Sequence, residues 1–321
     1  MPEVNWCDNT NYKEYDILQY STVYFFDVHV EVAAPDDLLE ILQTNFTCEV
    51  LNEEYKLYKY VNNNPPINYI TETDKFAHIS LDDTINIFED IYEKDYQSIF
   101  ENSTLKSLQK LHSEYGVVFS LYLFYENEDF NLSMFSDKYA VEFQNNSDWL
   151  KFGFHGKNEK TSYKETDYAE AKSDYELITN EIYRITNSEE CIDHVPRVSF
   201  FEGNMESIEA FRDSEHGLRG LLSADDDRVS YYLSEEVNDE VRKSEFYLDS
   251  NENITFFHTD VRIENQNQIK NLNSWIKSNT ILIVFTHEWQ LSNSEIVEDL
   301  TALCKAVNEN GYIFDYPENY I

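Results

Sequence analysis

The spacing of hydrophobic residues changes near residue 66 of the chain. Before that point, residues 26–32 alternate apolar and polar side chains, which predicts a strand with one face in water. Residues 35–42 predict a helix that Pro35 opens, and residues 47–61 predict a hairpin. The run 62–66 predicts a linker, because its two prolines continue neither a helix nor a sheet. We therefore expect a small α+β unit at residues 1–65.

From residue 66 to residue 321, short apolar runs alternate with segments whose apolar side chains recur three and four residues apart. This alternation is typical of parallel strands joined by crossover helices. About seven such units predict an α/β fold, a closed or nearly closed barrel of the distorted (β/α)7 type. The expected strands are 77–81, 117–124, 149–154, 197–201, 220–223, 254–257 and 281–286, and the expected helices are 85–91, 105–115, 137–144, 174–185, 205–214 and 294–308.

The charge of the chain narrows the classes of partner. Its 321 residues contain 24 Lys and Arg against 62 Asp and Glu, a formal net charge of −38. Such a charge repels phosphate backbones and anionic membrane surfaces, so we expect neither nucleic acid nor membrane partners. The four cysteines are far apart and form no C-x-x-C pair, which argues against structural zinc. The first residues contain no basic segment followed by an apolar run, so we expect a cytoplasmic protein without a signal peptide.

Five of the expected strands finish on ionisable residues. Because the carboxyl ends of parallel strands converge at one edge of the sheet, we expect these side chains to share one rim. The paired aspartates have a second interpretation: one of them could cap the helix that follows the strand, because Asp is common at helix N-caps. The strand-end residues are Asp82, Asp83, His155, Asp225 to Asp227, His258 and His287.

The order of these segments resembles the polysaccharide deacetylase family, the NodB-like carbohydrate esterases, from about residue 75 to the C-terminus. The family's first motif, a strand that runs into two aspartates, is similar to residues 80–84, which implies that Asp82 is the catalytic base and Asp83 a metal ligand. The second motif has two metal-binding histidines four residues apart, but here Glu159 follows His155. The resemblance implies a divalent metal ion, zinc or another transition-metal ion, bound by Asp83, His155 and Glu159. The alternatives are that Asn158 or His258 completes the site in place of Glu159, or that the site holds no metal. A carboxylate in place of imidazole favours harder ions.

Three further motifs complete the resemblance. The third implies that Arg197 pairs with Asp82 and holds it ionised, although the family's proline-aromatic continuation is missing after Arg197. The fourth implies that one acid among residues 225–227 orients this arginine. Those three acids cannot be ranked from the sequence, and we name the middle one, Asp226. The fifth is an apolar strand that ends on a histidine, here His287, which implies a general acid.

The chemistry of deacetylation fits this set of residues. A bound divalent ion can lower the pKa of water from about 16 to about 7, and Asp82 can then take its proton. The leaving group needs a proton in return, which His287 can donate near neutral pH. Trp289, two residues further on, can stack against a sugar ring. We therefore expect a metal-dependent hydrolase that removes acetyl groups from an N- or O-acetylated carbohydrate substrate.

Two other functions are compatible with the same residues. A barrel glycosidase without metal would use two carboxylates, one from the Asp82 and Asp83 pair with Glu288 or Asp226. A catalytically inactive barrel would bind carbohydrate or a protein partner through its aromatic surface, to which 24 Tyr and 21 Phe contribute. The replacement of the second metal histidine by Glu159 favours this inactive form.

Overall fold

The computed structural model describes residues 22–26, 46–52, 57–62 and 75–321. The chain divides into two compact units, Met1–Tyr69 and Ile70–Ile321. The domain boundary expected between residues 65 and 66 stays a prediction. Among the described residues, no helix is long and apolar enough to cross a membrane.

The described strands of the first unit form an antiparallel sheet. Its strands are β1 (Thr22–Phe26), β2 (Phe46–Asn52) and β3 (Leu57–Asn62), in the order β1-β3-β2. The antiparallel pairing of β2 with β3 confirms the predicted hairpin. Of the strand expected at 26–32, only Phe26 is described, as the last residue of β1. The expected helix 35–42 and residues 63–66 of the expected linker lie outside the described residues.

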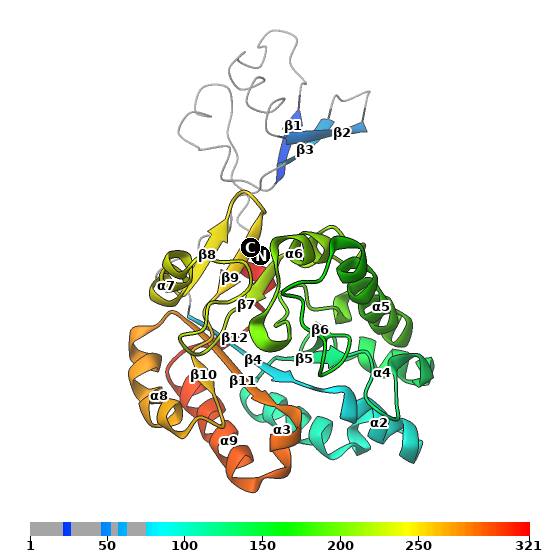
Figure 1. The fold of residues 1–321 in the computed structure, drawn as a ribbon, viewed down its shortest axis with the longest axis vertical. Coiled ribbons are helices and arrows are strands. Elements are labelled where there is room, and N and C mark those ends of the chain that lie inside the picture. The colour runs from blue at the N-terminus through cyan, green and yellow to red at the C-terminus, as the bar shows by residue number, and fades with distance from the viewer. Residues whose placement is uncertain (1–21, 27–45, 53–56, 63–74) are drawn as a thin grey trace. The chain divides into compact units, whose positions relative to one another are not determined.

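The second unit is built on a parallel sheet of order β10-β11-β4-β5-β6, with β12 also paired to β4 (Figure 1). In the register of β11 against β4, His287 lies beside Asp82 at the carboxyl ends of the two strands. The parallel α/β architecture predicted from the alternating pattern is therefore confirmed. The strands are β4 (Phe76–Asp82), β5 (Phe119–Phe124), β6 (Leu150–Gly156), β10 (Val261–Arg262), β11 (Ile281–His287) and β12 (Ile313–Phe314).

A three-stranded sheet in the same unit connects to both edges of the parallel sheet, at β10 and at β6. It consists of β7 (Gly220–Leu222) and β8 (Phe246–Asp249), each paired to β9 (Ile254–Phe257). After β9 the chain continues through residues 258–260 into β10, so that β9 pairs with β7 and β10 pairs with β11.

On its other side, the second sheet is connected to β6 by an irregular segment, residues 192–198. The amide of Asp193 donates to the carbonyl of Phe152 in β6 (2.8 Å), and the amide of Leu222 in β7 donates to the carbonyl of Pro196 (3.0 Å). With the chain from β9 to β10, these bonds arrange the strands in a distorted ring in which the irregular segment takes the place of a strand. The ring is not a closed hydrogen-bonded barrel, because the described strands β9 and β10 belong to separate sheets. The strand predicted at 197–201 is therefore wrong. The left-handed φ angles of Phe200 (59°) and Phe201 (58°) are incompatible with a strand.

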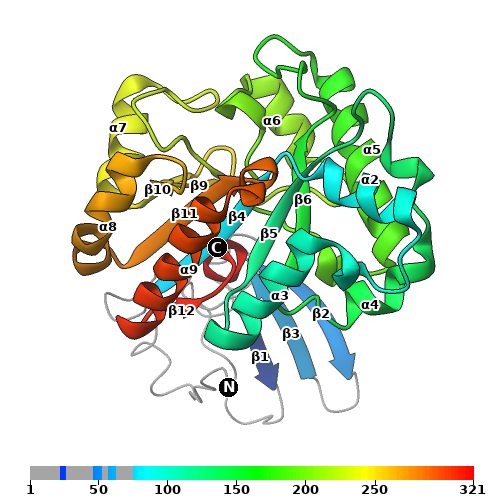
Figure 2. The same cartoon turned by 90° about the horizontal axis from the view of Figure 1, so that it is seen from below.

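Helices cover the outside of the strands (Figure 2). Helix α3 (Ser103–Tyr115) is capped at both ends: the side chain of its N-cap, Asn102, accepts two amide hydrogen bonds, and its C-cap, Gly116, lies in the left-handed region (φ 73°). Two helices were not predicted, α7 (Glu235–Ser244) and α8 (Gln266–Ser278). The six predicted helices correspond to α2 (Ile85–Lys94), α3 (Ser103–Tyr115), α4 (Ala140–Gln144), α5 (Tyr168–Thr186), α6 (Met205–Arg212) and α9 (Ser294–Glu309).

The interior of the ring changes from apolar to polar along the strands. In β4, alternate residues share one face, and this face reads Phe76, His78, Ser80, Asp82, all buried. Phe76, at the amino end, belongs to an apolar cluster with residues from β5, β7, β9 and β11. Ser80 and Asp82, toward the carboxyl end, contact Arg197. The apolar end closes the ring, and the polar end opens to solvent as a pocket.

Candidate functional site

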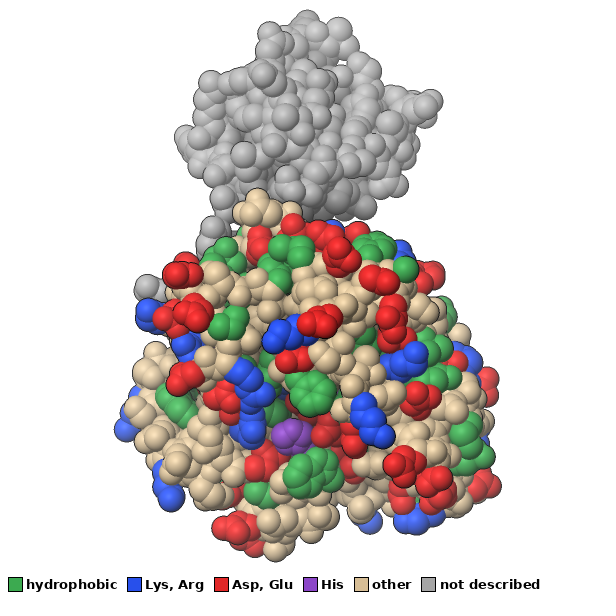
Figure 3. Space-filling model, in the orientation of Figure 1, with side chains coloured by type: hydrophobic (Ala, Val, Ile, Leu, Met, Phe, Trp, Pro, Cys, Tyr) green, Lys and Arg blue, Asp and Glu red, His purple; other side chains and the backbone are tan. Residues whose placement is uncertain are grey.

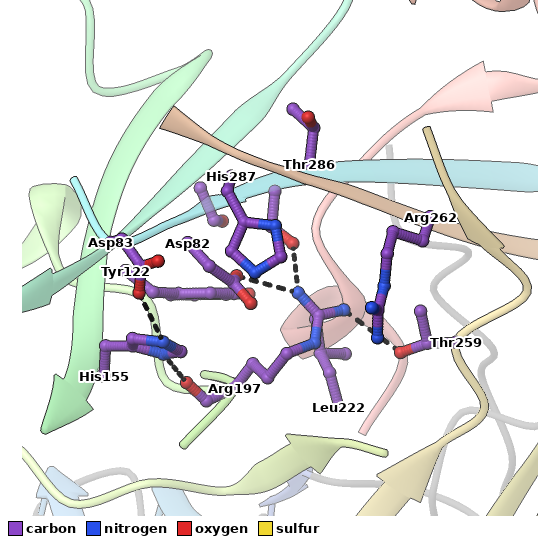
Figure 4. Close-up of polar contacts among 12 residues, drawn as sticks. Asp82, Asp83, Tyr122, His155, Arg197, Leu222, Thr259, Arg262, Thr286 and His287 are labelled. Carbon is purple, nitrogen blue, oxygen red and sulfur yellow. Dashed lines mark hydrogen bonds and ion pairs between the residues drawn. The ribbon is translucent and has the colours of Figure 1, made fainter. Parts of the chain in front are cut away.

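A pocket of about 420 Å³ lies at the carboxyl ends of β4, β6 and β11. Six of the seven site residues named from the sequence line it, and Asp226 does not. Figure 4 shows Asp82, Asp83, His155, Arg197 and His287 converging from three strands and the irregular segment. The complete lining is Asp82, Asp83, Phe124, His155, Glu159, Arg197, Val198, Ser199, Phe200, Phe201, Arg228, Arg262, Phe285, His287 and Trp289.

Asp82 and Arg197 form a buried ion pair. Arg197 is fully buried, and its Nη1 donates to Asp82 Oδ1 (3.0 Å) and to Ser80 Oγ (2.8 Å). Its Nη2 donates to Thr259 Oγ1 (3.0 Å). No described residue donates a hydrogen bond to Asp82 Oδ2, so this oxygen is available to a water or substrate in the pocket. The ion pair matters because both groups are buried, and desolvation of an unpaired ion costs several kcal/mol.

Asp83 reaches the same pocket because the chain turns there. Successive residues of a strand point to opposite faces, but Asp83 has a left-handed φ of 61°, and both aspartates line the pocket. Asp adopts this conformation more readily than most residues. Thr84 occupies the N-cap of α2 and no side chain caps that helix, so the capping role considered for the aspartates does not occur.

Asp83 and His155 form an ion pair, with 3.3 Å between Asp83 Oδ1 and His155 Nε2. Trp289 Nε1 also donates to Asp83 Oδ2 (3.4 Å). Burial disfavours the charged form of Asp83, but the hydrogen bond and charge of His155 outweigh it and lower the pKa of Asp83. Burial likewise opposes the charged form of His155, but the negative charges of Asp82 and Asp83 raise the pKa of His155.

The orientation of His155 is set by its other ring nitrogen. Nδ1 lies 2.6 Å from the carbonyl oxygen of Arg197 and must donate to it, because a carbonyl only accepts. Nε2 is therefore the nitrogen that faces Asp83 and the pocket. A histidine fixed in this way by a backbone carbonyl is typical of metal ligands.

The residues present do not fit the predicted three-residue metal site. Asp83 and His155 supply two adjacent donors, but Glu159 is exposed and makes no hydrogen bond or ion pair with either among the described contacts. Across residues 75–321 and the described strands of the first unit, no three His, Cys, Asp or Glu side chains are grouped to hold an ion. Glu159 shares the pocket without completing the donor set.

His287 is held by a carboxylate that the sequence analysis missed. Glu264 Oε1 accepts from the backbone amide of His287 (2.8 Å) and from Thr286 Oγ1 (2.7 Å), and it lies 3.3 Å from His287 Nδ1. Burial disfavours the charged imidazole, but the hydrogen bond to Glu264 outweighs it and raises the pKa of His287. Glu264 follows the short strand β10 by two residues, and the alternation of residues 261–264 was the available signal.

The acids at residues 225–227 do not contact Arg197. Asp226 binds Arg228, with Asp226 Oδ2 and Arg228 Nη2 2.6 Å apart, and Asp225 binds Arg262 at the same distance. The orienting role expected of Asp226 is instead performed by Thr259, which accepts from Arg197 Nη2. His258, the remaining strand-end residue, does not line the pocket, and burial lowers its pKa to about 4.

Two aromatic side chains stand at the pocket mouth. Phe200 is 50% exposed and Trp289 is 53% exposed, although large apolar side chains are usually buried. Phe200 and Phe201 both have left-handed φ angles, which are strained for bulky residues and often occur at functional sites. Figure 3 shows hydrophobic side chains on two sides of the exposed histidine, with basic and acidic ones on the other two.

Comparison with known proteins gives a distant structural likeness. No protein-family model matches the chain, and no curated protein matches it significantly. A CE4 domain of a multidomain xylanase from the hindgut metagenome of Trinervitermes trinervoides is 12% identical, covers 77% of this chain and 89% of its own, and has a TM-score of 0.45. A family 4 acetyl xylan esterase from Clostridium thermocellum, in complex with cobalt, is 9% identical, with 77% and 90% covered and a TM-score of 0.46.

A third similar structure is a CE4 family pseudoenzyme from Bacillus anthracis. It is 12% identical, covers 77% of this chain and 66% of its own, and has a TM-score of 0.43. Carbohydrate esterase family 4 is also the family that the five sequence motifs resemble. At identities near a tenth and TM-scores below 0.5, the likeness fixes no activity for this chain, and the contacts of its own pocket residues carry the proposals below.

Proposed function

We propose that this chain is a hydrolase that removes acetyl groups from an N- or O-acetylated carbohydrate at the pocket above β4, β6 and β11. The observation that carries the proposal is the register of β4 and β11, which sets Asp82 beside His287. Each of these two residues has a fixed partner, Arg197 for Asp82 and Glu264 for His287. A base and an acid on neighbouring strands, facing one pocket, are what acyl transfer to water requires.

In the proposed reaction, a water adds to the acetyl carbonyl carbon while Asp82 takes one of its protons. The C–N or C–O bond to the sugar then breaks, and the leaving nitrogen or oxygen takes a proton from His287. The products are the free amine or hydroxyl and acetic acid, which ionises to acetate by releasing its proton to solvent, and the proton on Asp82 returns to His287 through solvent. Arg197 keeps Asp82 in place, and Glu264 favours the protonated imidazole that the second step needs.

No step of this mechanism passes through a metal ion, because the donors Asp83, His155 and Glu159 do not form a three-residue group. The exposed rings of Phe200 and Trp289 support a carbohydrate ligand, since sugar rings pack on aromatic faces.

Acetate release tests the proposal. The purified full chain is incubated with N-acetylated glucosamine oligomers and with O-acetylated xylose oligomers, and acetate is measured by a coupled assay. We expect Asp82→Asn to lower kcat by about 10²- to 10⁴-fold, because general base catalysis contributes about that much. The control is Asp95→Asn, which alters an exposed aspartate paired with Lys138.

A folding defect in Asp82→Asn is separated from a catalytic one by thermal melting and by a second variant. His287→Gln alters a partly exposed side chain, and it should lose activity while the melting temperature stays near that of the wild type. Undiminished acetate release from a folded Asp82→Asn variant contradicts the base assignment. Binding of the oligomers without any acetate release from the wild type would replace the hydrolase with a carbohydrate-binding module.

A further inference from the structure

One wall of the pocket is an alternating stack of arginine and phenylalanine side chains. The guanidinium carbon of Arg228 lies 4.8 Å from the ring centre of Phe201, and that of Arg197 lies 6.0 Å from the same ring. Arg197 also lies 4.1 Å from the ring centre of Phe285, and Arg262 lies 5.1 Å from that ring. All five residues line the pocket. We call these five residues the arginine wall.

The three arginines are not equivalent. Arg197 is fully buried, and its hydrogen bonds go to Asp82, Ser80 and Thr259. Arg228 and Arg262 are partly exposed, with 43% and 28% of their side chains accessible. Their positions make these two arginines the members of the arginine wall that a ligand in the pocket can reach.

The two outer arginines are held in place from one side. Asp225 Oδ1 accepts from Arg262 Nη2 (2.6 Å), and Asp226 accepts from Nε and Nη2 of Arg228 (2.9 and 2.6 Å). The Nε of Arg262 is buried and has no hydrogen-bond partner among the described residues. Each guanidinium group has five N–H donors, so both keep donors that these aspartates do not use. A guanidinium group fixed in this way is prepared for a planar anion, because little side-chain entropy is lost when the ligand binds.

The concentration of arginine at this pocket is unusual for this chain. Three of its seven arginines line the pocket, although acidic residues outnumber basic ones by 62 to 24. The neighbouring pocket, which shares Glu159, has five acidic side chains and a single lysine in its lining, and contains no arginine. At physiological ionic strength charges farther than about 8 Å are screened, so the charge that a ligand meets at the arginine wall comes mainly from its three arginines and the aspartates paired with them.

We propose that the arginine wall binds a carboxylate of the substrate through Arg228 and Arg262, which makes the substrate an acidic saccharide. This inference rests on the proposed function for the acetyl group, and it adds a carboxylate-bearing sugar next to the acetylated unit. Arginine recognises a carboxylate with parallel N–H···O bonds, and Phe201 and Phe285 keep water away from the guanidinium faces.

Binding of two monosaccharides that differ in a single group tests this proposal without requiring turnover. Methyl glucuronide carries a carboxylate where methyl glucoside carries a hydroxymethyl group, and both are titrated into the full chain by NMR. We expect the glucuronide to bind at least about tenfold more tightly at low salt, because charge-assisted hydrogen bonds are the stronger ones. We expect this preference to shrink as salt is added.

The variants Arg262→Gln and Arg228→Gln locate the interaction. Each should reduce the preference for the glucuronide several-fold, while glucoside binding stays unchanged. The control is Arg212→Gln, because Arg212 is also 28% accessible and paired with acids, but it lies on α6 and does not line the pocket. Since Arg228 is exposed on a loop, its variant remains informative if Arg262→Gln fails to fold.

The outcomes distinguish failure of the carboxylate site from failure of the hydrolase. Equal binding of the two sugars by the wild type, or a preference that both folded variants retain, overturns the carboxylate site. A glucuronide preference in a protein that releases no acetate supports the arginine wall and contradicts the hydrolase. Release of acetate from neutral oligomers, with no preference for the glucuronide, supports the hydrolase and contradicts the arginine wall.

Discussion

The two halves of the pocket floor differ in how completely they are assembled. On one side, Asp82 and His287 each have a partner behind them, Arg197 and Glu264, that leaves the pocket face open. On the other side, Asp83 and His155 are bonded to each other. The first half is thus arranged for proton transfer, whereas the second half presents two donors that satisfy one another.

The two halves show that a matching sequence motif and an assembled site are separate observations. Asp83 and His155 match the metal ligands of the family motifs and do come together. The third member, Glu159, matches in position along the chain but lies exposed at the rim. A site of three donors therefore depends on the one residue whose type departs from the motif.

The largest expected effect comes from breaking the buried ion pair of Asp82 and Arg197. Arg197→Met leaves Asp82 buried without its cation, and removal of one partner of a buried pair costs about 3–5 kcal/mol. The matched change in the other half is Asp83→Asn, which alters a more accessible pair and should cost about 1 kcal/mol or less. Urea unfolding measures both. Similar losses for the two variants would show that the halves are equally important for stability.

A smaller effect is expected from adding a third metal ligand beside Asp83 and His155. Glu159→His restores the second histidine of the family motif, so we expect the affinity for zinc to rise by at least about tenfold over the wild type, because imidazole is a preferred zinc ligand. Isothermal titration with zinc measures the affinity, and Lys160→His serves as the control for a histidine added at the neighbouring exposed position. An unchanged affinity would show that the backbone at residue 159 keeps any side chain away from Asp83 and His155.

The smallest expected effect is a shift in the pKa of His287 when its partner Glu264 is changed. His287 acts as an acid, so the rate should fall as the pH rises through its pKa. Glu264 raises that pKa, and Glu264→Gln removes the charge, so the fall should move to lower pH. The pH dependence of kcat and an NMR titration of His287 measure the shift. Glu252→Gln, which alters a carboxylate bound to Arg212, should leave both unchanged, and a movement to higher pH for Glu264→Gln would contradict the assignment.

Much of the parallel fold was predictable because its strands are short, largely apolar runs that alternate with helical patterns. The sequence of β11 is apolar from Ile281 to Phe285. Strand β4 ends on Asp82, and Asp83 follows directly. Helix α7 was missed because it presents few apolar residues, and its buried positions are Asn238 and Val241. Helix α8 does carry a helical pattern of apolar residues that the sequence analysis missed: Leu272 and Ile276 are buried, and Ile269 and Trp275 pack against the core.

The site was predictable where a side chain directly follows a long strand. Asp82 and His287 satisfy this condition, and so their neighbourhood could be inferred from strand ends. Thr259 and Glu264 flank a strand of two residues, and the four alternating residues 261–264 are the shortest pattern that indicates a strand. The pairing of Asp226 with Arg228 was also beyond the sequence, since three consecutive acids give no indication of which one faces inward.

The register of β4 against β11 has a consequence for how the protein is made. Asp82 lies beside His287, so β4 pairs with a strand, β11, that is synthesised about two hundred residues later. Contacts between such distant parts of a chain slow folding, because a long loop must close before they form. During synthesis β5 can pair with one edge of β4 early, but the other edge stays unpaired until β11 has been made, and the acid–base pair forms only after residue 287 has been added.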